Sequence, residues 1–381
     1  MKKSGDKYFA LKRAIATTLV LLIITGVNIT AKSKPMLAPD RVIAFKRAQS
    51  LDNGINVSWL EQNWNNDLLT ANALKTSDFV LLKKLGFKSL RLPVAFKYFE
   101  SKHIPREKVF AIIDKIITQC KVYGFKLIID YHYGELNDNN YFQETKMIID
   151  TWLTVAKRYR KVSPNDLFFE LYNEPERINP KTWNDAAYNI LTAIRKVDKK
   201  RTIIIGATNY NSVQELSRFT RLADENVIYT FHFYEPFLFT HQGAAWVGND
   251  VASIAIPFPY NAAKFPPING KTKGTTGETY YNQYPREGTL QAVKDKLLLA
   301  KKWGDKYQVP VLCGEYGAYN KYADADSRCN YIKAVRTTLK AYHIPGIIWD
   351  YSGTFSIFNG APSFKNLPDC MKDAIGYMPG S

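Results

Sequence analysis

Two glutamates follow short apolar runs that lie far apart in the chain. Glu174 stands in Asn173-Glu174-Pro175, directly after the run LFFELY, and Glu315 stands near the end of VPVLCGEYG. A carboxylate at the end of a short hydrophobic strand is costly to desolvate unless it is paired or takes part in chemistry. One protonated carboxyl and one ionised carboxylate are the groups that cleave a glycosidic bond. The pair therefore predicts a two-carboxylate hydrolytic site.

Short apolar runs alternate with amphipathic segments through most of the chain. Eight runs are predicted to be strands: GINVSW, FKSLRLPV, FKLIIDYHY, LFFELYNEP, RTIIIGAT, NVIYTFHFY, VPVLCGEYG and IPGIIWDYS. A segment of helical period follows each run, and two of these segments end on Gly86 and Gly124, as helix C-termini commonly do. Continuous apolar runs are typical of parallel strands that are covered on both faces. The pattern predicts an α/β protein with a single-domain (β/α)8 TIM barrel over residues 39–381.

An open, doubly wound sheet is the alternative architecture for the same alternation. No GxGxxG follows the first strand, so the dinucleotide-binding form of that fold lacks its main support. We favour the barrel because polar residues stand at the C-terminal ends of strands all the way along the chain, and in a barrel these ends meet at one mouth. These residues are Arg91, His132, Asn173, Glu174, His232, Tyr234, Glu315 and Trp349.

The stretch from Glu235 to about Pro285 is rich in Pro, Gly, Tyr and Asn and has no clear helical or strand period. A structureless segment of this length is uncommon in a compact domain and is usually functional. We therefore expect an irregular functional loop after the sixth strand.

The neighbours of the two glutamates predict different protonation states. A cation such as Arg91 and a phenol such as Tyr234 beside Glu315 would favour its charged form, whereas Glu174 would stay protonated longer and serve as the acid. Asn173 can hydrogen-bond a sugar hydroxyl, and Trp349 offers a flat face for a pyranose ring. The four cysteines lack the close spacing of a zinc site, and we expect neither a metal nor an organic cofactor.

The motifs around these residues resemble glycoside hydrolase family 5, a clan A family of retaining (β/α)8 enzymes that includes many cellulases. The resemblance is carried in barrel order, from about Ile55 to Trp349, by GIN, RLP, DYH, NEP, HFY, GEYG and the final tryptophan. It implies that Glu174 is the acid/base and Glu315 the nucleophile. It also implies that Arg91 and Tyr234 orient the nucleophile.

The same resemblance assigns a binding role to further residues. It places His132, Asn173, His232 and Trp349 around the sugar at the cleaved bond. The segment YEPFLFTHQGAAW is similar to bacterial endoglucanases of the family, which implies that His241 and Trp246 stand in the cleft wall.

The function that these residues predict is a retaining endo-β-1,4-glucanase acting on cellulose or a related β-glucan. Hydrolysis of mannan, xyloglucan or mixed-linkage glucan, and glycosyl transfer to another sugar, stay open because remote subsites decide between them. A non-catalytic carbohydrate-binding barrel is the alternative of another class. Both carboxylates are present, which argues against it.

The first residues predict export from the cytoplasm. MKKSGDKYFALKR is basic and is followed by the apolar run AIATTLVLLIITGVNI, the pattern of a signal peptide over residues 1–31. An uncleaved membrane anchor is the main alternative, because the apolar run is only slightly short of a spanning helix. A cytosolic amphiphilic leader is the third. We expect a secreted or periplasmic protein.

Charge and cysteines add little to the assignment. The net charge is +17, but the lysines are scattered, and the chain has no arginine-rich tract or RNA-binding signature. We therefore expect no nucleic-acid partner and no obligatory protein partner, and keep attraction to an acidic polysaccharide or anionic cell surface as a minor hypothesis. Export would permit disulfides. Cys329 with Cys370 is one conceivable pair, and Cys313 fits a buried hydrophobic position.

Overall fold

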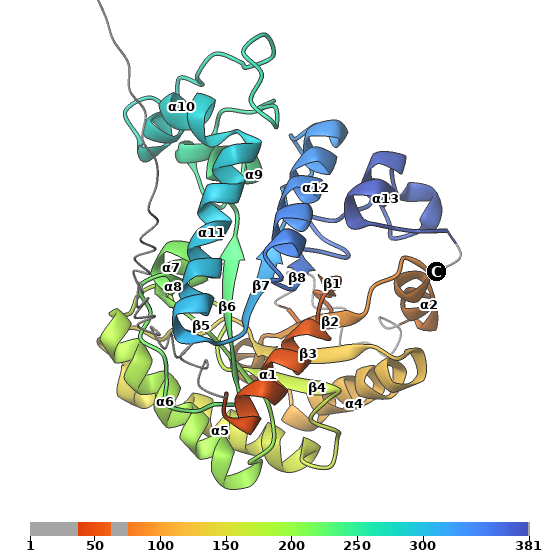
Figure 1. Ribbon diagram of the computed structural model, residues 1–381, viewed down its shortest axis with the longest axis vertical. Helices are drawn as coiled ribbons and strands as arrows, with labels where there is room; N and C mark the ends of the chain where they lie inside the picture. The colour runs from red at the N-terminus through yellow and green to blue at the C-terminus, as the bar shows by residue number, and fades with distance from the viewer. Residues whose placement is uncertain (1–36, 62–74, 380–381) are drawn as a thin grey trace, which may run out of the picture. The chain divides into compact units, whose positions relative to one another are not determined.

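Eight parallel strands close into one barrel in the computed structural model, which describes residues 37–61 and 75–379 (Figure 1). Each strand pairs with the next along the chain, and β1 pairs with β8 to close the ring. The strands are β1 Gly54–Asn56, β2 Ser89–Val94, β3 Lys126–Tyr131, β4 Leu167–Glu170, β5 Ile203–Gly206, β6 Val227–Phe233, β7 Val311–Tyr316 and β8 Gly346–Ile348. The predicted (β/α)8 barrel is confirmed.

Helices alternate with these strands along the chain (Figure 1). The longer ones are α1 Pro39–Gln49, α2 Thr76–Lys84, α4 Arg106–Tyr123, α5 Tyr141–Tyr159, α6 Pro180–Val197, α10 Thr276–Glu287, α11 Leu290–Tyr307 and α12 Ala325–Ala341. The shorter ones are α3 Phe96–Ser101, α7 Thr208–Asn211, α8 Val213–Leu216, α9 Phe237–Thr240, α13 Asp369–Ile375 and the 3-10 turns η2 Asn249–Val251 and η3 Phe364–Asn366.

Local sequence signals explain where several of these helices begin and end. The Asn179 side chain accepts a hydrogen bond from the Lys181 amide at the start of α6, and Thr289 caps α11 in the same way. Gly124 ends α4 with a φ of 75°, a conformation that favours glycine.

One layer of apolar side chains fills the interior of the barrel near the N-terminal ends of its strands. Six strands each contribute a fully buried side chain to it: Ile128, Phe168, Ile204, Ile228, Leu312 and Ile347. Ala48 at the end of α1 and Leu51 just after it join the same cluster and close the N-terminal end of the barrel. Because strand side chains alternate, the residue two positions later on each strand also points inward. That next layer reaches the C-terminal mouth, where the polar residues lie.

The expectation of one irregular loop from Glu235 to Pro285 is wrong. The segment contains α9, η2 and the twelve-residue helix α10. Thr275 caps α10 by accepting from the Gly277 amide, and Pro285 lies in its last turn, where it cannot donate a backbone hydrogen bond. The tyrosine and proline content of TGETYYNQYPRE hid its helical period. After β5 the chain forms the short helices α7 and α8.

Cys329 and Cys370 form a disulfide that joins α12 to α13, and Cys313 is buried in β7. Among residues 37–61 and 75–379, none of the helices combines the length and apolar composition that crossing a bilayer requires. The predicted leader over residues 1–31 lies outside these ranges.

Candidate active site

Arg91 lies at the centre of a buried polar layer just inside the mouth of the barrel. Its guanidinium, on β2, is fully buried and meets oxygen atoms of five side chains. These are Asn56, Asp130, Glu170, Asn173 and Glu315. Burial by itself lowers the pKa of Arg91, but the surrounding carboxylates raise it well above its usual value. The arginine is therefore a permanent cation in the floor of the site.

Glu315 accepts hydrogen bonds on both carboxylate oxygens. Arg91 donates from Nη1 to Oε1 at 2.6 Å, and the Tyr234 hydroxyl donates to Oε2 at 2.8 Å. Burial, followed by the charge of Glu315, raises the pKa of Tyr234 well above its usual value, so the phenol keeps the proton it donates. A cation and a neutral donor together stabilise the negative charge of this carboxylate. The structure thus brings Arg91 and Tyr234 to Glu315.

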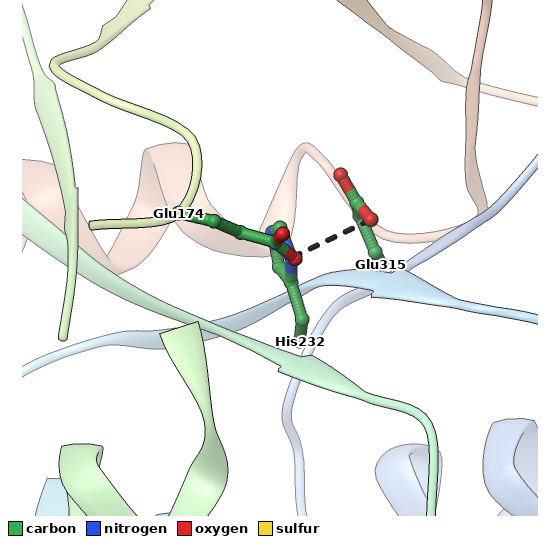
Figure 2. A group of neighbouring side chains, drawn as sticks. All are labelled: Glu174, His232 and Glu315. Carbon is green, nitrogen blue, oxygen red and sulfur yellow. Dashed lines mark hydrogen bonds and ion pairs between the residues drawn. The ribbon is translucent and has the colours of Figure 1, made fainter. Parts of the chain in front are cut away.

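Glu174 reaches the same point from the opposite side of the mouth, and His232 lies between the two glutamates (Figure 2). Glu174 Oε1 is 2.5 Å from His232 Nδ1, and this nitrogen is 3.4 Å from Glu315 Oε2. The contacting atoms of all three residues lie within 4.8 Å of one another. The two carboxyl groups therefore face each other across a gap that can hold one reacting carbon atom.

Burial shifts the pKa values of Glu174 and His232, which are in contact, in opposite directions. It raises the pKa of Glu174 to about 7 and lowers that of His232 to about 4. The proton between them therefore belongs to Glu174, whose hydroxyl donates to His232 Nδ1 when the carboxyl is protonated. The Glu174 side chain is 25% exposed, so it also faces the open cleft. Such a group can deliver a proton near neutral pH.

His132 and Trp349 form a flat wall beside the glutamates. The His132 ring lies parallel to the Trp349 indole, with ring centroids 5.8 Å apart and an interplanar angle of 5°. His132 Nδ1 is 2.6 Å from an Asp130 oxygen. Burial lowers the pKa of His132, but the hydrogen bond and charge of Asp130 outweigh it and raise the pKa overall. Trp349 is partly exposed and presents an aromatic face on which a sugar ring can stack.

Asn173 occupies the strand-end position that the sequence predicted. Its Oδ1 accepts from Arg91 Nη2 at 2.8 Å, which orients the amide and leaves its NH2 group to donate. This NH2 group can donate a hydrogen bond to a hydroxyl oxygen of a bound sugar.

His241 and Trp246 lie on one side of the mouth, where both pack against Phe355. The Phe355 ring lies 5.8 Å from Tyr234, 5.3 Å from His241 and 6.3 Å from Trp246, measured between ring centroids. His241 packs edge-on against Tyr234 at 5.1 Å, and Trp246 is 58% exposed at the rim. His241 therefore supports the Tyr234 ring, whereas Trp246 is free to meet a ligand.

Three buried polar residues of the site were missed from the sequence as functional candidates: Asn56, Asp130 and Glu170. Glu170 takes two hydrogen bonds from Arg91, at 2.7 and 2.9 Å, and is fully buried. Asn56 accepts from Arg91 at 2.9 Å and donates to the Gly314 carbonyl at 3.0 Å. A signal existed, because Asp130 and Glu170 each stand two positions after a residue of the apolar layer, Ile128 and Phe168, and so point inward as well.

Among the described residues, Glu174, His232 and Glu315 are also the single group whose donor atoms lie close enough together to hold a metal ion. A cation already meets Glu315, because Arg91 Nη1 is 2.6 Å from its Oε1. The Glu174 hydrogen bond to His232 uses another of the donor atoms that an ion would need. The arrangement therefore suits proton transfer between the residues better than a metal.

A family model described as Cellulase (glycosyl hydrolase family 5) matches residues 49–354. The match spans every strand of the barrel and all ten predicted site residues. Endoglucanase 3 of Fibrobacter succinogenes is 34% identical over 352 residues, which cover 84% of this chain and 52% of that protein. The chain thus spans about half the length of this relative. Endoglucanase C of Acetivibrio thermocellus is 29% identical over 306 residues, covering 74% of this chain and 85% of the relative.

A solved structure supports the fold independently. The endoglucanase Cel5A from the hyperthermophilic Thermotoga maritima superposes with a TM-score of 0.70 at 24% identity, covering 87% of this chain and 99% of that one. At this identity the likeness concerns the architecture of the barrel.

Proposed function

The chain belongs to the cellulase family, glycosyl hydrolase family 5, and we propose that it is a retaining endo-β-1,4-glucanase that hydrolyses internal bonds of cellulose or a related β-glucan. The observation that carries the proposal is the pair Glu174 and Glu315, whose nearest carboxyl atoms lie within 4.8 Å. Carboxyl groups about 5–5.5 Å apart suit direct attack on the sugar, whereas inverting enzymes keep about 6.5–9.5 Å for a water molecule.

In the first step a Glu315 oxygen attacks the anomeric carbon as the bond to the leaving sugar breaks. Glu174 gives its proton to the leaving oxygen, so the products are a glycosyl ester on Glu315 and a free sugar hydroxyl. Arg91 and Tyr234 hold the attacking carboxylate in one orientation through bonds of 2.6 and 2.8 Å. This pre-organisation lowers the cost of reaching the attack geometry.

In the second step Glu174, now ionised, takes a proton from water while the water oxygen attacks the anomeric carbon. The ester bond breaks, Glu315 leaves as a carboxylate, and Glu174 is protonated again. Before the first step His232 Nδ1, 2.5 Å from Glu174 Oε1, accepts a hydrogen bond from the protonated carboxyl, which keeps its proton until the leaving oxygen takes it. Two inversions at one carbon retain its configuration.

The remaining residues are proposed to hold the sugar. Trp349 stacks on the ring at the cleaved bond, with His132 behind it. Asn173 donates to a hydroxyl, and Trp246 at the rim binds a sugar farther along the chain. Exposed aromatic faces suit the apolar faces of pyranose rings.

The proposal is tested by measuring reducing ends released from carboxymethylcellulose, mixed-linkage glucan, xyloglucan, glucomannan and pure β-mannan, with the anomer of the first product read by proton NMR. We expect preferential cleavage of the cellulose derivative, a rapid drop in viscosity and a β product. Preference for mannan or xyloglucan would keep the mechanism and replace the substrate. An α product as the first one formed would overturn the retaining mechanism, and silence on every polymer with oligosaccharide binding intact would support a binding protein.

Hydrolysis is expected to be insensitive to chelators. Arg91 supplies the positive charge beside Glu315, so no step of the mechanism needs a divalent ion. Activity after dialysis against EDTA should equal that of the untreated protein within error. A loss that Zn2+, Ca2+ or Mn2+ restores would show that Glu174, His232 and Glu315 hold a metal.

The alkaline side of the pH profile is expected to report Glu174. Burial raises its pKa to about 7, and the acid must be protonated to assist departure of the leaving sugar. The value of kcat/KM should therefore be full below this pKa and fall as the pH rises through about 7. Measuring kcat/KM from pH 4 to 9 tests this. A profile that stays flat up to pH 9 would contradict the assignment.

We also propose that the protein is secreted or periplasmic. The basic and apolar N-terminal segments support export, and the Cys329–Cys370 disulfide suits an oxidising compartment. N-terminal sequencing of the protein recovered from culture fluid, periplasm and membranes should find a start shortly after the apolar run. An intact N-terminus in the membrane fraction would indicate an anchor, and an intact one in the cytosol would refute export.

A further inference from the structure

The loop that follows β8 lines a cavity that contains neither Glu174 nor Glu315. Its volume is about 440 Å3, within the size range of small-molecule sites. It is bounded by Asn320 after β7, Arg328 in the first turn of α12, and the segment from Ser352 to Pro362. We call it the Arg328 cavity.

Arg328 differs from the other buried arginines. Four arginines of the described chain are buried: Arg47, Arg91, Arg201 and Arg328. The first three each meet at least three oxygen acceptors. Arg328 is only 5% exposed, yet among the described residues a single acceptor meets its guanidinium, the backbone oxygen of Ser356.

The Arg328 guanidinium has few protein partners for its charge. It carries five N–H donors, and those that no acceptor of the described chain meets are not fully buried but reach the cavity that Arg328 lines. Burial is the cause that lowers the pKa of Arg328 to about 10, so the group still carries its charge at neutral pH. An anion in the cavity would supply acceptors for the remaining N–H donors and a negative charge to balance the guanidinium.

The cavity is also lined by neutral donors. None of the described residues that line it is acidic. Asn359 forms no side-chain hydrogen bond within the described chain, so its amide can donate to a ligand, and the Ser352 hydroxyl is similarly available. The forked cation can bind a carboxylate through two parallel hydrogen bonds, and the amide and hydroxyl groups around it can hydrogen-bond the hydroxyls of a sugar.

We propose that the Arg328 cavity binds the carboxylate of an acidic sugar, with Arg328 as the principal donor. The acid is either a free uronic acid or an acidic unit of a glycan. The site is distinct from the glutamate pair and goes beyond the proposed hydrolytic function.

The loop that follows β8 connects this cavity to the catalytic cleft. Phe355 packs against Tyr234 and His241 on the cleft side, and the next residue, Ser356, accepts the Arg328 hydrogen bond. The backbone amide of Asn320 donates to the Thr354 carbonyl at 2.9 Å, which ties the loop after β7 to the same segment. A ligand on Arg328 would therefore brace the loop that carries Phe355.

The test is a calorimetric titration of the full chain with D-glucuronate, and with D-glucose as the neutral match, while saturating cellobiose fills the cleft. We expect glucuronate to bind and to raise the Tm, and glucose to do neither. Arg328→Gln should weaken glucuronate binding at least about tenfold, since a charge-assisted hydrogen bond is lost. Arg328→Lys, which keeps the charge but not the fork, should bind with an intermediate affinity.

Asn359→Asp keeps the proposal testable if the Arg328 variants fail to fold. It adds a carboxylate to the cavity and should abolish glucuronate binding. Asn261→Asp is the matched control, because it adds the same charge at an exposed site outside the cavity and should leave binding unchanged. The proposal is overturned if wild-type protein does not bind glucuronate, if glucose binds equally, or if Asn359→Asp binds as tightly as the control.

Substrate kinetics distinguish a free uronic acid from an acidic unit of a glycan, and this part of the test rests on the proposed function. In Arg328→Gln, a higher KM for carboxymethylcellulose with an unchanged KM for neutral hydroxyethylcellulose would assign the carboxylate to the glycan. Unchanged KM values for both, with glucuronate binding lost, would assign it to a free acid. Failure of hydrolysis on both polymers in the wild type would count against the proposed function and leave the titration result standing.

Discussion

Glu315→Gln is expected to lower kcat on a β-glucan by about 10⁴-fold or more, in the range found when a nucleophile is removed. Glutamine has nearly the same shape, and its amide oxygen can still accept from Arg91 or Tyr234, which hold Glu315 at 2.6 and 2.8 Å. It cannot form the glycosyl ester, because a neutral amide is a poor nucleophile. Oligosaccharide binding should change little, since Trp349, Asn173 and Trp246 are untouched. Reducing-end release measures the first effect, and calorimetry with cellotetraose measures the second.

Glu135→Gln is a suitable control for this experiment. Glu135 is exposed and pairs with Lys97 at the surface, so its substitution removes one negative charge without reaching the cleft. It should keep wild-type activity. Substantial activity in Glu315→Gln at a matched purity would refute the nucleophile assignment. Loss of both activity and binding, with a lowered Tm, would point instead to collapse of the Arg91 layer.

The ends of the strands could be predicted well from the sequence. In a closed parallel barrel every strand delivers its last residues to one mouth, so Arg91, His232 and Glu315 are brought together by the topology alone. Predicting that these residues meet required neither the lengths of the strands nor any distance between the residues. Apolar runs that ended in polar residues carried enough information for the fold and for the polar residues that meet at its mouth.

The buried partners were harder to predict, because they depend on which residues point inward. Glu170 lies in the same apolar run as Glu174, and although strand alternation points it inward, only the structure shows that it meets Arg91. In a sequence it looks like an isolated charge within a hydrophobic strand. The Arg328 cavity depends even more on tertiary packing, since its residues come from loops and a helix that no local period connects.

The environment of Glu174 also required the structure. A sequence predicts an acid with few cationic neighbours, but it does not predict the 2.5 Å contact with His232. Burial raises the pKa of Glu174 to about 7, so both its protonated and its ionised forms are populated near neutral pH. Glu315, less than 5 Å away, lies between its two donors.

Glu174→Ala is expected to separate substrates by their leaving groups. The natural leaving group is a sugar hydroxyl, which departs poorly without a proton, so kcat/KM on cello-oligosaccharides should fall on the order of 10²–10⁴-fold, the usual contribution of general acid catalysis. A 2,4-dinitrophenyl β-cellobioside has a leaving group that needs no proton. Its first step should proceed at nearly the wild-type rate, and the burst of dinitrophenolate should be followed by slow hydrolysis, because no base activates water.

Azide sharpens the same experiment. The alanine side chain leaves a space where the Glu174 carboxylate stood, beside His232 and open to the cleft. Azide needs no general base, so it should attack the glycosyl ester from this side, restore turnover of the dinitrophenyl substrate and yield a β-glycosyl azide. Equal losses on both substrates would contradict the acid role, and an α-azide would assign the nucleophile to Glu174 instead. Because burial raises the pKa of Glu174 to about 7, the fall in rate above that pH should also vanish in this variant, and its persistence would mean that another group supplies the proton.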